Sequence, residues 1–172
     1  GLAVTSKYLD GMLERLFTYD FHEFISLLSV AFTLVHVLVL TLDRYLPYSF
    51  AQILVPFISP YRPFWVGVGV IAFYIIGLVT VTFYLRNRIG TRAFRVIHVL
   101  SLIGYIGVTL HGYYAGTDTA LSAMQILYKV SGLVVLFFTI YWLVLLGLRK
   151  MEKQRTTALP ARLPQKPHAI PR

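Results

Sequence analysis

Four long apolar runs constrain the fold more strongly than any other feature of this sequence. They extend from about Phe24 to Leu42, Phe64 to Leu85, Val96 to Ala115 and Val130 to Leu148, and none contains Asp, Glu, Lys or Arg. A membrane-crossing helix needs roughly 20 predominantly apolar residues, which is close to the length of each run. A chain that is 57% hydrophobic and only 13% charged is also too apolar for an ordinary soluble domain. We therefore expect an all-α fold, an integral membrane helical bundle.

The runs predict one compact domain, residues 1–148, with four membrane-spanning helices that contact membrane lipid. With flanking residues included, the predicted helices cover about 21–42, 64–85, 93–115 and 121–148. Residues Tyr48–Phe57 are too few to cross a bilayer and are expected to lie in its interface. Residues 149–172 form a basic, proline-rich cytoplasmic tail, which we expect to be a disordered segment or a strap that docks on a partner.

The distribution of positive charge predicts the orientation of the chain. The net charge is +9, and the basic residues flank the apolar runs instead of forming a patch within them. Residues 86–95 contain four arginines and no acid, and residues 149–172 contain seven basic residues and one glutamate. Because cytoplasmic segments of membrane proteins carry an excess of Lys and Arg, both termini are expected in the cytoplasm of a bacterial plasma membrane protein. No nucleic acid is expected as a partner.

Several kinds of chemistry are excluded by what the sequence lacks. Without cysteine there are no disulfides, no thiolate-held iron–sulfur clusters and no covalently attached c-type haem. No phosphate-binding loop, dinucleotide fingerprint or nucleophile motif is visible. The sequence Gly67-Val68-Gly69 lies inside an apolar run, where we assign it to helix packing.

Two spaced pairs of histidines carry the functional signal. His22 and His36 bracket the first run, fourteen residues apart, and His98 and His111 bracket the third, thirteen residues apart. At ~1.5 Å per residue each spacing covers roughly 20 Å of a hydrocarbon core of about 30 Å. Two facing helices would thus offer one histidine pair near each side of the membrane. Such a pair is typical of a b-type haem site, which favours a two-haem path for electrons across the membrane.

The four histidines also have explanations other than haem binding. A single intramembrane histidine is more often a neutral imidazole bonded to a neighbouring helix, and His22, next to Glu23, also fits an interfacial position. A zinc ion needs about four clustered ligands, whereas these histidines form two groups far apart along the helices. A proton relay would usually recruit intramembrane carboxylates, and the four runs contain none.

Helical periodicity supports one pair better than the other. At about 100° per residue, His22 and His36 fall within ~40° of one face, whereas His98 and His111 are roughly 140° apart. Two glycines between the second pair would permit either close approach of a flat ligand or ordinary helix packing. These glycines are Gly104 and Gly107.

Three stretches carry a resemblance to a known family. They read DFHEFISLLSVAFTLVHVLVLTLD, SPYRPFWVGVGVIAFY and YLRNRIGTRAFRVIHVLSLIGYIGVTLHGYYAGTD, and they cover most of residues 19–118. With these residues the chain resembles the ferric reductase-like transmembrane domain family. That family also contains the membrane part of NADPH oxidases and the haem subunit of the periplasmic methionine-sulfoxide reductase system.

The resemblance implies two b-type haems, with the four histidines as axial ligands of the haem iron. His22 and His98 would hold the inner haem, and His36 and His111 the outer haem. Members of the family usually have about six membrane helices, with at least one before the first histidine helix, and residues 1–8 resemble only the end of such a helix. We therefore expect either that a preceding segment is missing here or that the chain is a reduced variant. Many relatives continue into a flavin and nicotinamide domain, which we do not expect in this chain.

The expected role is a membrane subunit of a haem-containing oxidoreductase within a multi-subunit complex. A redox donor subunit or a quinol would act on the cytoplasmic side, with an acceptor outside. Basic residues near the two haem positions are candidate partners for haem propionates, although membrane topology explains them equally well. They are Arg92 and Arg95 on the inner side and Arg62 and Lys129 on the outer side. The alternative functions are a structural or assembly subunit of a larger membrane complex and a quinone-linked cytochrome b component.

Overall fold

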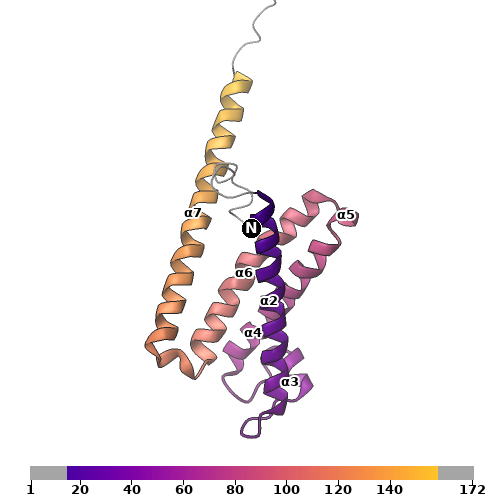
Figure 1. The fold of residues 1–172 in the computed structure, drawn as a ribbon, viewed down its shortest axis with the longest axis vertical. Helices are drawn as coiled ribbons and strands as arrows, with labels where there is room; N and C mark the ends of the chain where they lie inside the picture. The colour runs from indigo at the N-terminus through magenta and orange to yellow at the C-terminus, as the bar shows by residue number, and fades with distance from the viewer. Residues whose placement is uncertain (1–14, 159–172) are drawn as a thin grey trace, which may run out of the picture.

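The computed structural model describes residues 15–158, and within that part of the chain every regular element is a helix (Figure 1). Four helices are long and apolar enough to cross a membrane. They are α2 (Arg15–Leu42), α4 (Pro63–Tyr84), α6 (Thr91–Ala115) and α7 (Ser122–Ala158). The prediction of an all-α bundle with four membrane-spanning helices is therefore confirmed. The predicted remnant of an earlier helix at residues 1–8 lies outside the described residues.

Short elements join the long helices. The connector after α2 contains α3 (Phe50–Leu54), which starts with a capping box formed by Ser49 and Gln52. Helix α4 begins at Pro63, where a proline at the first helical position leaves no backbone N–H unpaired. Between α4 and α6 lies α5 (Arg86–Ile89), and a 3₁₀ turn, η1 (Asp118–Ala120), precedes α7. The sequence did not predict α5.

Helix α7 is longer than predicted. We expected the last membrane helix to end near Leu148 and a basic tail to follow, either disordered or docked on a partner as a strap, but α7 continues to Ala158. Residues 149–158 contain neither glycine nor proline, and most are good helix formers, so nothing interrupts the backbone hydrogen bonds. The expectation of disorder was therefore wrong for residues 149–158. The rest of the predicted tail, 159–172, lies outside the described residues.

The tightest packing in the bundle is between α4 and α6. It depends on small residues: Ala72 of α4 is 2% exposed, and its Cβ lies next to Gly107 of α6. Gly104 of α6 is buried against the side chains of Ile75 and Ile76. In a membrane, small residues at such positions let two helix backbones approach closely. The structure thus assigns both glycines to helix packing.

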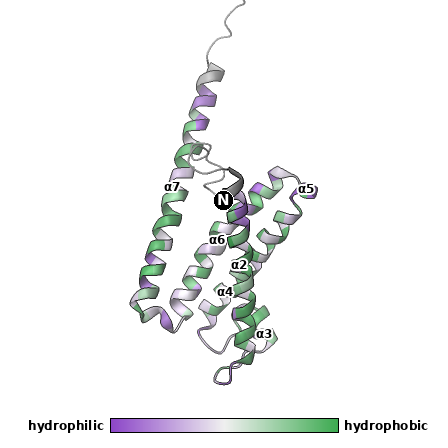
Figure 2. Ribbon diagram, in the orientation of Figure 1, coloured by the Kyte–Doolittle hydropathy of each residue, from purple (hydrophilic) through white to green (hydrophobic). Residues whose placement is uncertain are grey.

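The outward faces of the helices are apolar, as a lipid environment requires. Helices α2 and α7 expose large hydrophobic side chains along most of their length, for example Phe32, Leu38 and Phe137 (Figure 2). Helix α4 is the most enclosed of the four. The connector between α2 and α4 folds onto α4, with Phe57 packed over Gly67 and the Tyr74 hydroxyl donating to the Leu54 carbonyl at 2.6 Å. One end of α4 is thereby covered.

Candidate functional site

The structure brings the four histidines together as two pairs between α2 and α6. The ring centres of His22 and His98 are 6.0 Å apart, with an angle of 87° between the ring planes. The ring centres of His36 and His111 are 6.3 Å apart, with an angle of 71°. On α2 the pairs are separated by fourteen residues, or roughly 21 Å of helix. Each pair therefore occupies its own level of the bundle.

The two helices that carry these histidines hardly touch each other through their backbones. Helix α6 packs closely on α4, whereas α2 makes few close backbone approaches to any other described helix. Helices that pack directly have their axes about 8–10 Å apart, so the side chains between α2 and α6 have more room than in an ordinary helix contact. The imidazoles of both helices extend into this space and face each other across it.

The outer pair is held by a third helix. His111 Nδ1 lies 3.0 Å from the backbone carbonyl oxygen of Trp65 in α4. Because a carbonyl can only accept, Nδ1 carries the proton and the other ring nitrogen, Nε2, has a free lone pair. The ring also lies directly over Gly69, where there is no side chain to displace it. His36, in contrast, is exposed at the surface of the described chain.

The inner pair has a different environment. His98 Nδ1 is buried and has no hydrogen-bond partner among the described residues. The ring of Phe94, one turn earlier on α6, lies 5.2 Å from the His98 ring. On α2, the Ser26 hydroxyl donates to the backbone carbonyl of His22 at 2.7 Å. This bond does not involve the His22 imidazole. The His98 ring is thus packed by an apolar group, and among the described residues its Nδ1 is not fixed by a hydrogen bond as that of His111 is.

The ring separations suit two imidazoles that bind one metal ion from opposite sides. With a metal–nitrogen bond of about 2.0 Å and about 1.2 Å from nitrogen to ring centre, two such rings have centres about 6.4 Å apart. The angle between the ring planes does not matter for this test, because each ring can turn about its metal–nitrogen bond. The observed separations of 6.0 and 6.3 Å are close to that value.

A bare metal ion fits these pairs poorly. Across residues 15–158, no group of three or more His, Cys, Asp or Glu side chains is placed to hold a metal ion. A zinc site would need about four ligands at one point. Two imidazoles on opposite sides suit a metal that brings its remaining ligands with it, as the iron of a porphyrin does.

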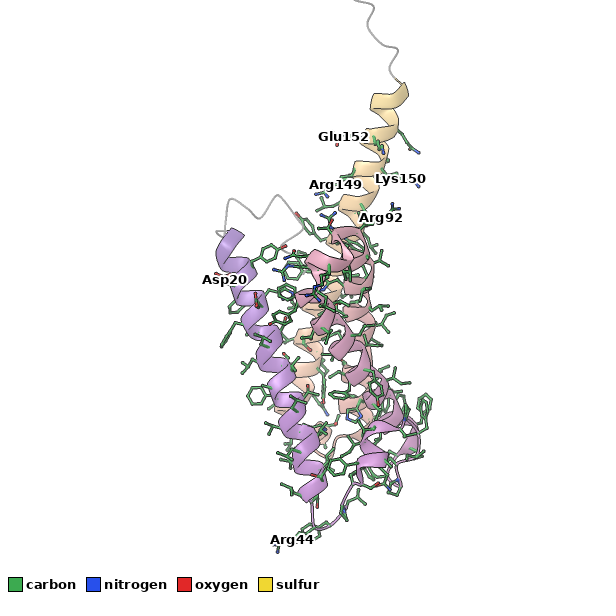
Figure 3. All side chains as sticks on the ribbon, turned by 90° about the vertical axis from the view of Figure 1, so that its right-hand side faces the viewer. Asp20, Arg44, Arg92, Arg149, Lys150 and Glu152 are labelled. Carbon is green, nitrogen blue, oxygen red and sulfur yellow. The ribbon has the colours of Figure 1, made fainter. Side chains whose placement is uncertain are left out.

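Basic side chains lie at both ends of the bundle, but they differ in what they contact. Arg62 donates a hydrogen bond to the Tyr114 carbonyl and lies over the Tyr61 ring, so it joins the start of α4 to the end of α6. Arg92, Arg95 and Lys129 are exposed. Figure 3 shows Arg92 at the same end of the bundle as Arg149 and Lys150, away from Arg44. Their predicted role as propionate partners stays a prediction.

Two features of this site were not predicted from the sequence. The rings of Trp65 and Tyr114 stack with centres 4.0 Å apart and planes 15° apart, next to the carbonyl that binds His111. Gly69 was assigned to packing in general, without a partner. A glycine four residues after Trp65, on the same helix face, was the available signal.

One comparison with known proteins gave a match. A family model described as "Ferric reductase like transmembrane component" matches residues 4–109, which is more than half of the chain. The matched segment contains His22, His36 and His98 and ends two residues before His111. No match was found among curated proteins or among solved structures.

Proposed function

The chain belongs to the family of ferric reductase like transmembrane components, and from this membership we propose that it carries electrons across a membrane with two b-type haems. The observation that carries the proposal is the presence of two histidine pairs, at two levels of one bundle, with separations that match ligation from opposite sides. In this proposal His22 and His98 hold one haem, and His36 and His111 hold the other.

A b-type haem bound by two histidines supplies a one-electron redox centre in a medium of low dielectric. The protein supplies the axial ligands, the spacing between the two levels and the apolar surroundings. Fixing the imidazoles on α2 and α6 places the two centres at different depths. In a membrane, the apolar side chains that α2 and α6 expose would limit the access of water to the two centres.

The proposed orientation in the membrane rests on the distribution of positive charge. Arg92, Arg149 and Lys150 lie at one end of the bundle (Figure 3), which is also the end of α6 that carries His98. By the positive-inside rule we propose that this end faces the cytoplasm, as do both termini. Green fluorescent protein fused to the C-terminus should then fluoresce, because it folds in the cytoplasm. Activity of a C-terminal alkaline phosphatase fusion instead would reverse the orientation.

The proposed partners follow from this orientation. A donor subunit or a quinol acts at the cytoplasmic end, and an acceptor acts outside, so the chain serves as the membrane subunit of an oxidoreductase complex. In this proposal Arg92 and Arg95 would pair with the propionates of the inner haem, and Arg62 and Lys129 with those of the outer haem. Arg62 already donates to the Tyr114 carbonyl, so its guanidinium would have to serve both groups.

Haem analysis of the purified protein tests the proposal. We expect a reducible six-coordinate b-type spectrum and about two haems per chain by the pyridine haemochrome assay, because each histidine pair holds one haem. His36→Ala should remove one haem and retain the other. His168→Ala is the matched control, since His168 is the one histidine outside the two pairs, and it should retain both. A colourless protein would leave a structural or assembly role as the better explanation.

A further inference from the structure

We infer that Gly69 is a positioning residue for the outer haem. Because Gly69 has no side chain, the His111 ring can occupy the space beside it, and we call this space the seat of the ring. This inference deepens the proposed function and rests on it. It concerns how one of the four proposed ligands is aimed, and not whether the histidines bind haem.

The seat is defined by atomic contacts. A Cβ atom added to Gly69 would lie 2.5 Å from His111 Nδ1, 2.6 Å from its Cγ and 2.9 Å from its Cε1. Three ring atoms therefore occupy the space of the absent side chain, and any larger residue would have to move the whole imidazole. Real Cβ atoms essentially never have contacts shorter than 3.0 Å.

The same face of α4 also supplies the hydrogen bond that orients the ring. Trp65 is four residues before Gly69, so its carbonyl lies one helical turn away on the same side. That carbonyl accepts from His111 Nδ1 at 3.0 Å. Gly69 permits the His111 ring to approach α4, and the Trp65 carbonyl sets the rotation of that ring. Nε2 is therefore the ring nitrogen left to bind a metal.

Further contacts keep this face of α4 in register with the end of α6. The indole ring of Trp65 stacks on the Tyr114 ring, and Arg62 donates to the Tyr114 carbonyl three residues after His111. An aromatic stack and a charge-assisted hydrogen bond to a backbone group both restrict sliding of one helix along the other. The seat and the ring it receives are thus held at fixed relative positions.

In the part of the chain that the structure describes, the inner site has no equivalent of this glycine and this carbonyl. His98 Nδ1 is buried without a partner among the described residues. Gly104, on the same helix, packs against isoleucine side chains and not against an imidazole. A change at Gly69 should therefore affect the outer haem and leave the inner haem in place.

The test compares two alanine substitutions in the same helix. Gly69→Ala places a Cβ 2.5 Å from the nearest atom of the His111 ring, whereas Gly77→Ala is the matched control, because nothing packs within 4 Å of a Cβ at position 77. Both add one methyl group and one helix-favouring residue. For Gly69→Ala we expect roughly 10–100-fold weaker retention of one haem, as for loss of other ligand-orienting groups, or a shifted midpoint potential of that haem. Gly77→Ala should match the wild type in haem content, potential and electron paramagnetic resonance spectrum.

A double substitution separates positioning from a general structural role. In a His111→Ala background there is no ring to displace, so adding Gly69→Ala should cause no further change in haem content or in the potential of the remaining haem. Unchanged haem content, spectrum and potentials in Gly69→Ala, with a two-haem wild type, would overturn the inference and leave the proposed function intact. Loss of both haems in Gly69→Ala but not in Gly77→Ala would also overturn it. A wild type without haem would refute the proposed function itself.

Discussion

Substitution of Gly107 by leucine should weaken the contact between α4 and α6 on which both sites depend. A Cβ at position 107 would lie 3.0 Å from the Ala72 Cβ and 3.8 Å from the Val68 Cγ1. Ala72 is 2% exposed, so it has no free space into which it can move. A leucine adds three more carbon atoms to this point, and overpacking of this kind costs about 1–3 kcal/mol.

The higher helix propensity of leucine has to be separated from the cost of overpacking between α4 and α6. Leucine is better than glycine in a helix by about 0.8–1.0 kcal/mol, which partly offsets the overpacking. Gly132→Leu in α7 is the matched control, because no atom lies within 4 Å of a Cβ there. The difference between the two variants isolates the packing term. We expect about 1–3 kcal/mol, or roughly a 5- to 150-fold change in the folding equilibrium.

Denaturation in detergent micelles measures this difference. Far-ultraviolet circular dichroism reports the helices, and the haem absorbance reports the two sites in the same samples. Addition of Ala72→Gly to Gly107→Leu removes the atom in closest contact, so it should recover part of the lost stability, with a coupling of about 0.5–3 kcal/mol. If Gly107→Leu were as stable as Gly132→Leu, α4 and α6 would not pack through Ala72 and Gly107.

Two further predictions concern the difference between the sites and the weak attachment of α2. The two haems should titrate with separate midpoint potentials, the outer one lower. The hydrogen bond from His111 to a carbonyl would make that imidazole a stronger donor to ferric iron, whereas His98 Nδ1 has no hydrogen-bond partner within residues 15–158. A potentiometric titration checks this, with the one-haem variant His36→Ala assigning the inner component, and a single shared midpoint would contradict it. Protein prepared without haem should show faster amide hydrogen exchange in α2 than in α4, because α2 makes few close contacts with the other helices. Equal protection of both helices, with and without haem, would refute that expectation.

The sequence was sufficient to predict the four membrane helices because their signal is local. Each run of uncharged apolar residues is recognisable without knowledge of its neighbours, and α2 and α6 end at Leu42 and Ala115 as predicted. Hydropathy does not report where a helix stops once it leaves the apolar region. It therefore missed the extension of α7 through residues 149–158, which are polar but helix-forming.

The candidate site was predictable in its residues but not in its geometry. The spacing of the histidines identified all four positions, whereas the angular offset of roughly 140° between His98 and His111 argued against a shared partner helix. In the structure both face α2, because the direction of an imidazole depends on its two side-chain torsions as well as on its Cα position. For His111 those torsions are set by contacts with α4. Such a tertiary contact leaves no periodic trace in the sequence.

Helix α2 is held only weakly by packing, and the proposed haem ligation would attach it to the rest of the bundle. Helix α2 supplies two of the four imidazoles, yet its surface is largely exposed, and it makes few close approaches to α4 and α6. In a membrane, helices do not associate through a hydrophobic effect, so α2 needs specific interactions to keep its register. Two metal–ligand bonds at separate levels would fix both its height and its rotation, since one bond alone leaves the helix free to pivot. In that arrangement the free energy of haem binding would also be free energy of folding, because the imidazoles that hold the haems would also tie α2 to α6.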